Sequence, residues 1–221
     1  MKARDAIFAA LRAAQPDKAS AQEIEAQAAA LAKAMRACLP PLEGDLAEIF
    51  TARASAEKVG ATVEKVASLA DLPQAVARYI AANNLATDFA LQPDQHLENL
   101  DWGALRPGAP LKSDTPLAVG LARSGVAETG SLVFHSSPEA PTLYGFLPLH
   151  HLVALDASTI VPRFEDYAAA EKGKPSPRNV NFITGASGTT DIEGVLARGA
   201  HGPRKLHIVL FGRPISFMPN S

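Results

Sequence analysis

The chain has 221 residues, of which 47% are hydrophobic and 20% charged, a composition typical of a globular protein with one sizeable domain and an appendage. Its 21 basic and 23 acidic residues give a net charge of −2, which does not favour nucleic acid as a partner. The one cysteine, Cys38, excludes a disulfide within the chain and a cysteine-ligated iron–sulfur cluster or Cys₄ zinc site built by this chain alone. Cys38 follows a helical pattern, so we expect it to be a buried small hydrophobic residue.

The first 15 residues carry a charge every few positions and contain no long apolar run. Secretory signal peptides and membrane-spanning helices both need such a run. The sequence therefore predicts neither, and we expect a cytoplasmic protein with no membrane span.

Residues 1–59 are predicted to form an N-terminal helical arm. Alanine-rich helical patterns cover 2–14 and 20–38, and the second ends before Pro40 and Pro41, which cannot continue a helix. A third helix is expected from Asp45 to Val59, with Gly60 at its end. The arm carries no recognisable chemistry and is interpreted as a packing or oligomer surface.

Residues 60–221 are predicted to form an α/β domain with a mixed, mostly parallel sheet and flanking helices. Short apolar runs typical of strands alternate here with helical patterns, the first helix covering Leu72 to Ala82. The runs between 117 and 155 lack long intervening helices, so part of the sheet should be antiparallel. The expected strands are 61–66, 88–91, 117–121, 127–135, 151–155, 179–184 and 206–211.

The segment 183–203 (ITGASGTTDIEGVLARGAHGP) carries the most informative pattern. A strand leads into a glycine-bearing turn, and a capping box from Thr190 to Glu193 then predicts a helix that ends at Gly199. Backbone N–H groups at such a junction form an anion-binding loop. The alternative is that these hydroxyl side chains only cap the helix. The candidate ligand-binding residues here are Gly185, Ser187, Gly188, Thr189, Thr190 and Asp191.

Three polar residues at the margins of apolar runs, Glu128, His151 and His201, are the catalytic candidates. We predict that they converge on the pocket beside the anion-binding loop. Alternatively, Glu128 is a solvent-exposed strand-end residue paired with Arg123, and His201 only complements a helix dipole. Neighbouring residues complete the ligand-binding set, namely Thr129, Gly130 and Gly202.

No metal or cofactor is assigned from the sequence. His150 and His151 would point to opposite faces of a strand, and no matching ligand set accompanies them. The G-x-G-x-x-G fingerprint of nucleotide cofactors is missing as well. The other histidines, His96, His135 and His207, show no constellation in the sequence.

Four blocks together resemble the LUD-domain family, in particular its lactate-utilisation protein C branch. They are AETGSLV at 127–133, LPLHHLVAL at 147–155, ITGASGTTDIE at 183–193 and GAHGPRKLHIVL at 199–210. The family loop commonly reads G-P-S-x-T-x-D-I-E, often with arginine after the serine. In this chain Ala186 replaces the proline, and Gly188 takes the position after the serine.

The resemblance implies a fold like that of ribose-5-phosphate isomerase, glucosamine-6-phosphate deaminase and CoA transferases. It also implies membership of a system that oxidises L-lactate to pyruvate, whose partner subunits carry iron–sulfur clusters. This chain would be the cluster-free accessory component, binding a small anionic metabolite or a partner at the strand ends. The alternative is a stand-alone acyl or CoA transferase-like enzyme that uses Glu128 as its nucleophile.

Overall fold

The computed structural model describes residues 3–14, 19–190 and 196–212. The chain divides into two compact units, Met1–Leu42 and Glu43–Ser221. The sequence-based boundary between residues 59 and 60 therefore differs from the structural one. The reason is helix α3 (Leu46–Ala54), which buries one face, including a fully inaccessible Phe50, in the core of the second unit.

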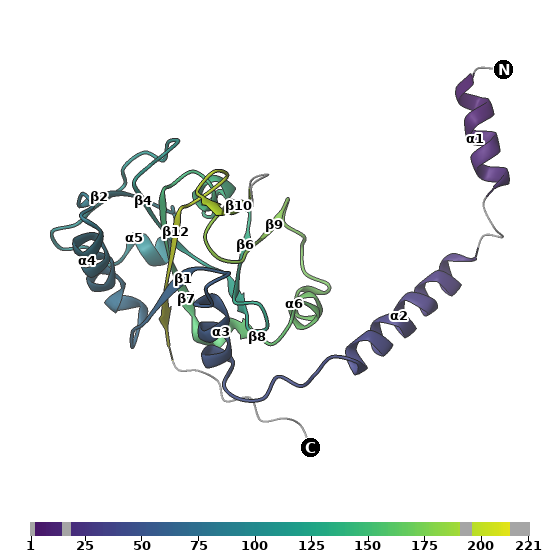
Figure 1. Cartoon of the computed structure of the whole chain (residues 1–221), viewed down its shortest axis with the longest axis horizontal. Coiled ribbons are helices and arrows are strands. Elements are labelled where there is room, and N and C mark those ends of the chain that lie inside the picture. The colour runs from purple at the N-terminus through teal and green to yellow at the C-terminus, as the bar shows by residue number, and fades with distance from the viewer. Residues whose placement is uncertain (1–2, 15–18, 191–195, 213–221) are drawn as a thin grey trace. The chain divides into compact units, whose positions relative to one another are not determined.

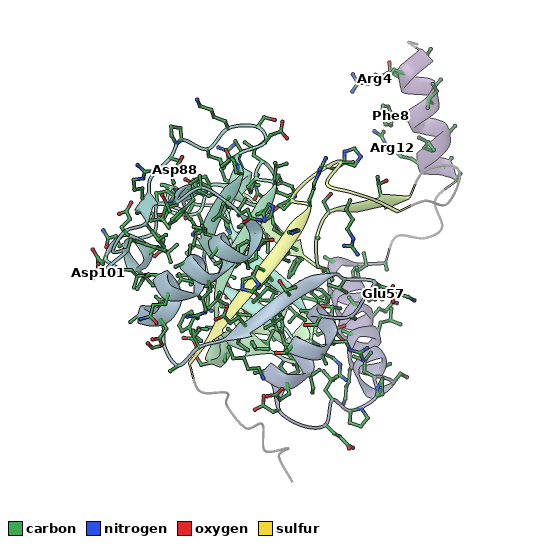
Figure 2. All side chains as sticks on the ribbon, turned by 60° about the vertical axis from the view of Figure 1, so that its left-hand side comes forward. Arg4, Phe8, Arg12, Glu57, Asp88 and Asp101 are labelled. Carbon is green, nitrogen blue, oxygen red and sulfur yellow. The ribbon has the colours of Figure 1, made fainter. Side chains whose placement is uncertain are left out.

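The first unit contains helices α1 (Ala3–Ala13) and α2 (Ala21–Ala37). The apolar side chains of α1 are exposed, and the Arg4 guanidinium lies 5.6 Å from the centre of the Phe8 ring (Figure 2). Cys38 is exposed too, so the expectation of a buried thiol is wrong. An amphipathic pattern buries a side chain only where another element packs against it, and the described side chains from 21 to 34 are all exposed.

The second unit is built on a six-stranded sheet in which every pair of neighbouring strands is parallel (Figure 1). The predicted α/β class with a mostly parallel sheet is confirmed. From one edge to the other, the strands are β1 (Ala61–Lys65), β12 (Lys205–Phe211), β7 (His150–Asp156), β4 (Leu117–Leu121), β2 (Asp88–Leu91) and β3 (Arg106–Pro107).

Helices cover one face of this sheet. Leu72 and Val76 of α4 (Leu72–Asn83) are fully buried there with Phe89 of β2, and Leu97 of α5 (Gln95–Glu98) belongs to the same core. Strand alternation sends Leu152 of β7 to this side, as expected for side chains that point to opposite faces in turn.

The opposite face packs against α3 and a second, mixed sheet with the order β8-β5-β6-β9. Strands β5 and β6 form an antiparallel hairpin, β6 pairs antiparallel with β9, and β5 pairs parallel with β8. Their bounds, with those of the remaining short helices, are β5 (Ser124–Val126), β6 (Ser131–His135), β8 (Ile160–Val161), β9 (Val180–Ile183), α6 (Phe164–Glu171), η1 (Leu69–Asp71), η2 (Thr142–Gly145) and η3 (Ala157–Thr159).

The helix predicted from Thr190 to Gly199 is wrong. The structure has strands β10 (Gly188–Thr190) and β11 (Leu196–Arg198) there, paired antiparallel, with residues 191–195 outside the described part. The adjacent β-branched residues Thr189 and Thr190 favour the extended backbone that β10 adopts.

The strand order reverses between β2 and β4. After β2 the chain first adds β3 on the outer side, and then places β4, β7 and β12 on the other side, back toward β1. In open parallel sheets such a switch point leaves a crevice at the carboxyl ends of the strands, where ligands commonly bind.

Candidate functional site

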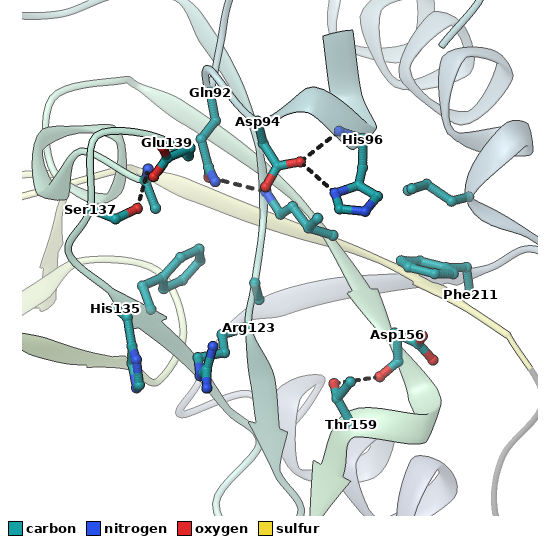
Figure 3. Close-up of a pocket in the computed structure, with 15 residues that line it drawn as sticks. Gln92, Asp94, His96, Arg123, His135, Ser137, Glu139, Asp156, Thr159 and Phe211 are labelled. Atoms are coloured by element: carbon teal, nitrogen blue, oxygen red, sulfur yellow. Dashed lines mark hydrogen bonds and ion pairs between the residues drawn. The ribbon is translucent and has the colours of Figure 1, made fainter. Parts of the chain in front are cut away.

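A cavity of about 460 Å³, here called the carboxyl-end cavity, lies where the parallel strands end (Figure 3). Gln92 follows β2, Arg123 follows β4, and Asp156 and Phe211 are the last residues of β7 and β12. Phe134 and His135 of β6 line it from the second sheet. The cavity thus occupies the switch point, and its size is that of a small-molecule site.

Arg123 is the arginine of this cavity, and an acidic partner holds it in place. One terminal nitrogen of its guanidinium group donates to both carboxylate oxygens of Glu171 in α6, at 3.2 and 3.3 Å, and Lys174 donates to the same carboxylate at 3.0 Å. Burial alone would raise the pKa of Glu171, but the hydrogen bonds from Lys174 and Arg123 outweigh it and lower that pKa. Glu171 therefore stays ionised and positions Arg123 beside the cavity.

His135 is a neutral imidazole in the same wall. Its Nε2 is hydrogen-bonded to the hydroxyl of Tyr167 and lies 4.0 Å from Glu171. Burial lowers its pKa, and the positive charge of Arg123 lowers it further. Sequence reasoning missed this constellation because its partners come from α6, more than 30 residues later. The sequence feature that could have pointed to it is a histidine at the last position of the buried strand β6.

Gln92 connects the two strands at the switch point. Its side chain is almost fully buried, and Oε1 accepts a hydrogen bond from the backbone N–H of Leu121 at 3.1 Å. Gly120 makes room for this contact, because a Cβ at that position would lie 2.8 Å from Gln92 Oε1 and 3.3 Å from His151 Nε2. The floor of the cavity therefore needs glycine at 120.

His151 is buried behind the cavity rather than in it. Its ring stacks on Phe134, with centroids 5.9 Å apart, while His150 turns the other way and meets the Tyr79 hydroxyl at 3.0 Å. The predicted opposite orientation of the two histidines is thus correct. Neither ring nitrogen of His151 has a hydrogen-bond partner within the described residues, and burial lowers its pKa to about 4. The ring is therefore neutral, and burial of its two ring nitrogens without hydrogen bonds lowers the stability of the fold.

This burial predicts a pH dependence that a leucine at position 151 should weaken. The pKa of His151 is about 4 in the fold against an ordinary 6.5, so the unfolded chain takes up the proton first and stability falls as the pH drops below about 6.5. Between pH 7 and pH 5, the wild type should lose about 2 kcal/mol more than His151→Leu. Urea unfolding at both pH values measures this difference, and equal losses in the two proteins would show that His151 is not buried as a neutral ring.

Glu128 lies in the turn between β5 and β6, not on the strand predicted for 127–135. Its Oε1 accepts a hydrogen bond from the backbone N–H of Phe164, the first residue of α6, at 3.3 Å, and its Oε2 lies 3.6 Å from Arg163. A carboxylate at a helix N-terminus stabilises that helix. Glu128 therefore acts as a capping residue, and its partner is Arg163 rather than the Arg123 considered from the sequence.

Two of the glycines predicted to bind a ligand, Gly130 and Gly185, allow close packing of the backbone. Gly130 has φ +68°, and a Cβ there would lie 2.4 Å from the backbone nitrogen of Ala54. Gly185 has φ +87°, and its Cβ would lie 2.1 Å from the carbonyl oxygen of Val59. Both positions let the chain approach α3 or the turn after it. Thr129, which precedes Gly130, is hydrogen-bonded to Ser131 at 2.7 Å.

Part of the predicted site does come together, in a second cavity of about 410 Å³ beside β9. It is lined by Gly185 and Ser187 of the loop after β9 and by His201 and Gly202. The Ser187 N–H donates to the carbonyl of Pro203 at 2.8 Å, which holds the two segments together.

The predicted convergence of Glu128, His151 and His201 on one pocket is not what the structure shows. Of the three, only His201 lines the cavity beside β9, and neither Glu128 nor His151 lines that cavity or the carboxyl-end cavity. Among the other candidates, Gly188, Thr189 and Thr190 form β10, which pairs with β11, and Asp191 falls outside the described residues. The candidates at the margins of apolar runs belong to different faces of the fold, which their positions in the sequence could not reveal.

Comparison with known proteins identifies the relatives of this chain. Residues 112–211 match the model of the LUD domain family, and this range includes β4, β6 and most of the wall of the carboxyl-end cavity. The resemblance to the LUD-domain family is confirmed.

The chain is similar to lactate utilization protein C of Geobacillus kaustophilus, with 42% identity over 94 residues covering 39% of each protein. Lactate utilization protein C of Anoxybacillus flavithermus is 34% identical over 115 residues, covering 51% of this chain and 52% of that protein. An uncharacterised protein of Neisseria meningitidis is 41% identical over 90 residues, covering 40% of this chain and 39% of that protein. The chain thus spans about two fifths to one half of the length of these curated relatives.

A solved structure has the same fold. The crystal structure of a DUF162 family protein from Deinococcus radiodurans superposes with a TM-score of 0.52 at 18% identity, covering 78% of this chain and all of the other. At that identity the likeness concerns the fold alone.

Proposed function

We propose that this protein is an accessory component of an L-lactate to pyruvate oxidation system and binds a small anionic ligand in the carboxyl-end cavity. The pathway rests on the relatives named lactate utilization protein C. The observation that carries the ligand site is the position of this cavity, which lies at the switch point of a parallel sheet with Arg123 in its wall.

The accessory role follows from what the chain can supply. One cysteine cannot provide the four ligands that an iron–sulfur cluster usually needs, and the sequence lacks the glycine fingerprint for nicotinamide or flavin nucleotides. Electrons from lactate would therefore pass to partner subunits that carry iron–sulfur clusters. All of these subunits would act together in the cytoplasm.

A small 2-hydroxy or 2-oxo carboxylate fits the part of the carboxyl-end cavity formed by Arg123, His135 and Gln92. The lining also contains Asp94, Asp156 and Glu139, of which the first two accept hydrogen bonds from backbone N–H groups. The planar guanidinium of Arg123 can offer its remaining N–H groups to a carboxylate while one nitrogen stays on Glu171. The neutral ring of His135 and the amide of Gln92 are uncharged polar groups for the hydroxyl or keto oxygen.

The alternative, a transferase that uses Glu128 as nucleophile, has less support. The Glu128 carboxylate is occupied by the N-terminus of α6 and by Arg163. A nucleophile must reach its substrate, and Glu128 lines neither the carboxyl-end cavity nor the cavity beside β9.

The proposal predicts how lactate oxidation depends on this chain. The purified protein should show no iron–sulfur absorbance and no lactate-dependent reduction of an artificial electron acceptor. Co-expressed cysteine-rich partner subunits should reduce the acceptor, and their rate should fall at least about tenfold when this chain is left out, a loss of roughly 1.4 kcal/mol in transition-state stabilisation. Robust turnover by this chain alone would overturn the accessory role and favour the enzyme alternative.

A further inference from the structure

A cationic cavity of about 620 Å³ lies at the other end of the parallel sheet, and the proposed function does not use it. We call it the amino-end cavity because Lys205 and Leu206 begin β12 and Thr62 belongs to the start of β1. Tyr79 from α4 and Arg198 from β11 complete its walls. Its volume falls within the range of metabolite sites, roughly 300–1,000 Å³.

The charge of this cavity is one-sided. Arg198, Arg204 and Lys205 line it, and the described lining includes no aspartate or glutamate. The carboxylate of Glu64 lies 3.6 Å from Nε2 of the lining residue His207 and forms an ion pair with Arg78 of α4. Three unopposed cations around one hollow favour an anion of more than one charge.

Arg198 and Arg204 each lie against a glycine. Any side chain at that glycine would collide with the arginine. A Cβ on Gly60 would lie 2.4 Å from a terminal nitrogen of Arg198, whose guanidinium also donates to the carbonyl of Glu57 at 3.2 Å. Glu57 is labelled in Figure 2. A Cβ on Gly199 would lie 2.0 Å from Cγ of Arg204. The guanidinium group of Arg198 therefore lies against Gly60, and the side-chain stem of Arg204 lies against Gly199.

Lys205 has a structural role that the arginines do not share. It donates to the side chain of Asn83 at 2.8 Å, at the last residue of α4, where a cation complements the helix dipole. That role explains one of the three cations. Arg198 and Arg204 project from the β10–β11 hairpin and from the segment before β12, and they complement no helix end in the described part of the chain.

The aromatic wall of the cavity is rigid and carries no charge. The rings of Tyr79 and His207 stack with centroids 4.7 Å apart, and Nδ1 of His207 is hydrogen-bonded to Oγ1 of Thr62 at 2.7 Å. Burial lowers the pKa of His207 despite the opposing effect of Glu64, so the ring is neutral at pH 7. A ligand thus meets cations on one side and an uncharged planar wall on the other.

We propose that the amino-end cavity is a second binding site, which takes a small polyanion such as a phosphate ester or a polycarboxylate through Arg198 and Arg204. Charge-assisted, forked hydrogen bonds from arginine suit both phosphoryl and carboxylate groups. This site is separate from the carboxyl-end cavity, which contains none of the same lining residues.

Isothermal titration of the full chain with pyrophosphate and, separately, with citrate tests this site at constant ionic strength. We expect saturable binding of at least one probe, and the tighter probe identifies the phosphoryl or the carboxylate source. Arg198→Gln and Arg204→Gln should each weaken that binding by about tenfold or more, since each removes a charged hydrogen-bonding group.

The matched control is Arg106→Gln, which removes the same charge from an exposed arginine on β3 that lines neither the amino-end nor the carboxyl-end cavity. It should bind the probe as the wild type does. Thermal melts confirm that each variant is folded. Binding of neither probe, or equal weakening in the Arg204 and Arg106 variants, would overturn the proposal.

Discussion

Gly185→Ala is expected to destabilise the α/β unit by about 3 kcal/mol, a large effect for a single added methyl group. Two costs combine at this position. The backbone has φ +87°, where an L side chain is strained, and the new Cβ would lie 2.1 Å from the carbonyl oxygen of Val59. That carbonyl also accepts a hydrogen bond from the Ala186 N–H at 3.2 Å, so the segment cannot move away without losing a contact.

Gly173→Ala is the matched control, because Gly173 has φ +80° and nothing within 4 Å of the added Cβ. Strain alone should cost it about 1 kcal/mol. Urea unfolding of both variants at pH 7 separates strain from collision. If Gly185→Ala matched its control in stability yet abolished lactate-dependent activity, the ligand-binding role inferred from the sequence would be restored and the packing role rejected.

Phe50→Ala should cost about 3–5 kcal/mol, the usual range for a fully buried phenylalanine. Phe50 has no accessible surface and belongs to the core shared by α3, the second sheet and β12. We expect this loss of stability because the chain divides at Leu42, so that α3 belongs to the α/β unit. Thermal or urea unfolding measures the loss.

Phe8→Ala provides the comparison within the arm. Phe8 is 45% exposed on α1, and its truncation should change stability by less than about 0.5 kcal/mol. A small loss at both positions would instead support the boundary at residue 59 that the sequence favoured, with α3 as part of a separate arm.

Local patterns in the sequence were sufficient to predict most of the α/β unit. The helix expected from Leu72 to Ala82 is observed as α4 (Leu72–Asn83), because its apolar residues recur at helical spacing and Asn84 adopts the left-handed conformation that ends it. Buried strands such as β4 and β7 appear in the sequence as continuous apolar runs between turn residues. This pattern is expected for parallel strands whose two faces are both covered.

The errors arose where tertiary context outweighs a local pattern. A capping box at Thr190 resembles a helix start, but Thr190 pairs with Leu196 as part of β10 and β11. The helical pattern around Cys38 predicted burial, but in the first unit the described part of α2 has no partner element that would cover it.

The site was the hardest part to predict because its residues come from several strand ends and from the second sheet. The sequence pointed to strand ends as the place for a ligand, and the carboxyl-end cavity lies at strand ends. It could not select Arg123 or His135, since their partner Glu171 lies in α6 and no spacing rule links the three. Pairings of this kind require knowledge of which loops meet at the switch point.

The most direct test of the account is lactate-dependent acceptor reduction by the co-expressed partner subunits, with this chain supplied as Arg123→Ala or as Lys174→Ala. Both variants remove a cation from Glu171, but only Arg123 lines the carboxyl-end cavity. We predict that Arg123→Ala lowers the rate at subsaturating lactate by about tenfold, as expected for the loss of a charged hydrogen bond, while Lys174→Ala stays within about twofold of the wild type. Equal rates for the two variants would contradict the assignment of the carboxyl-end cavity as the ligand site.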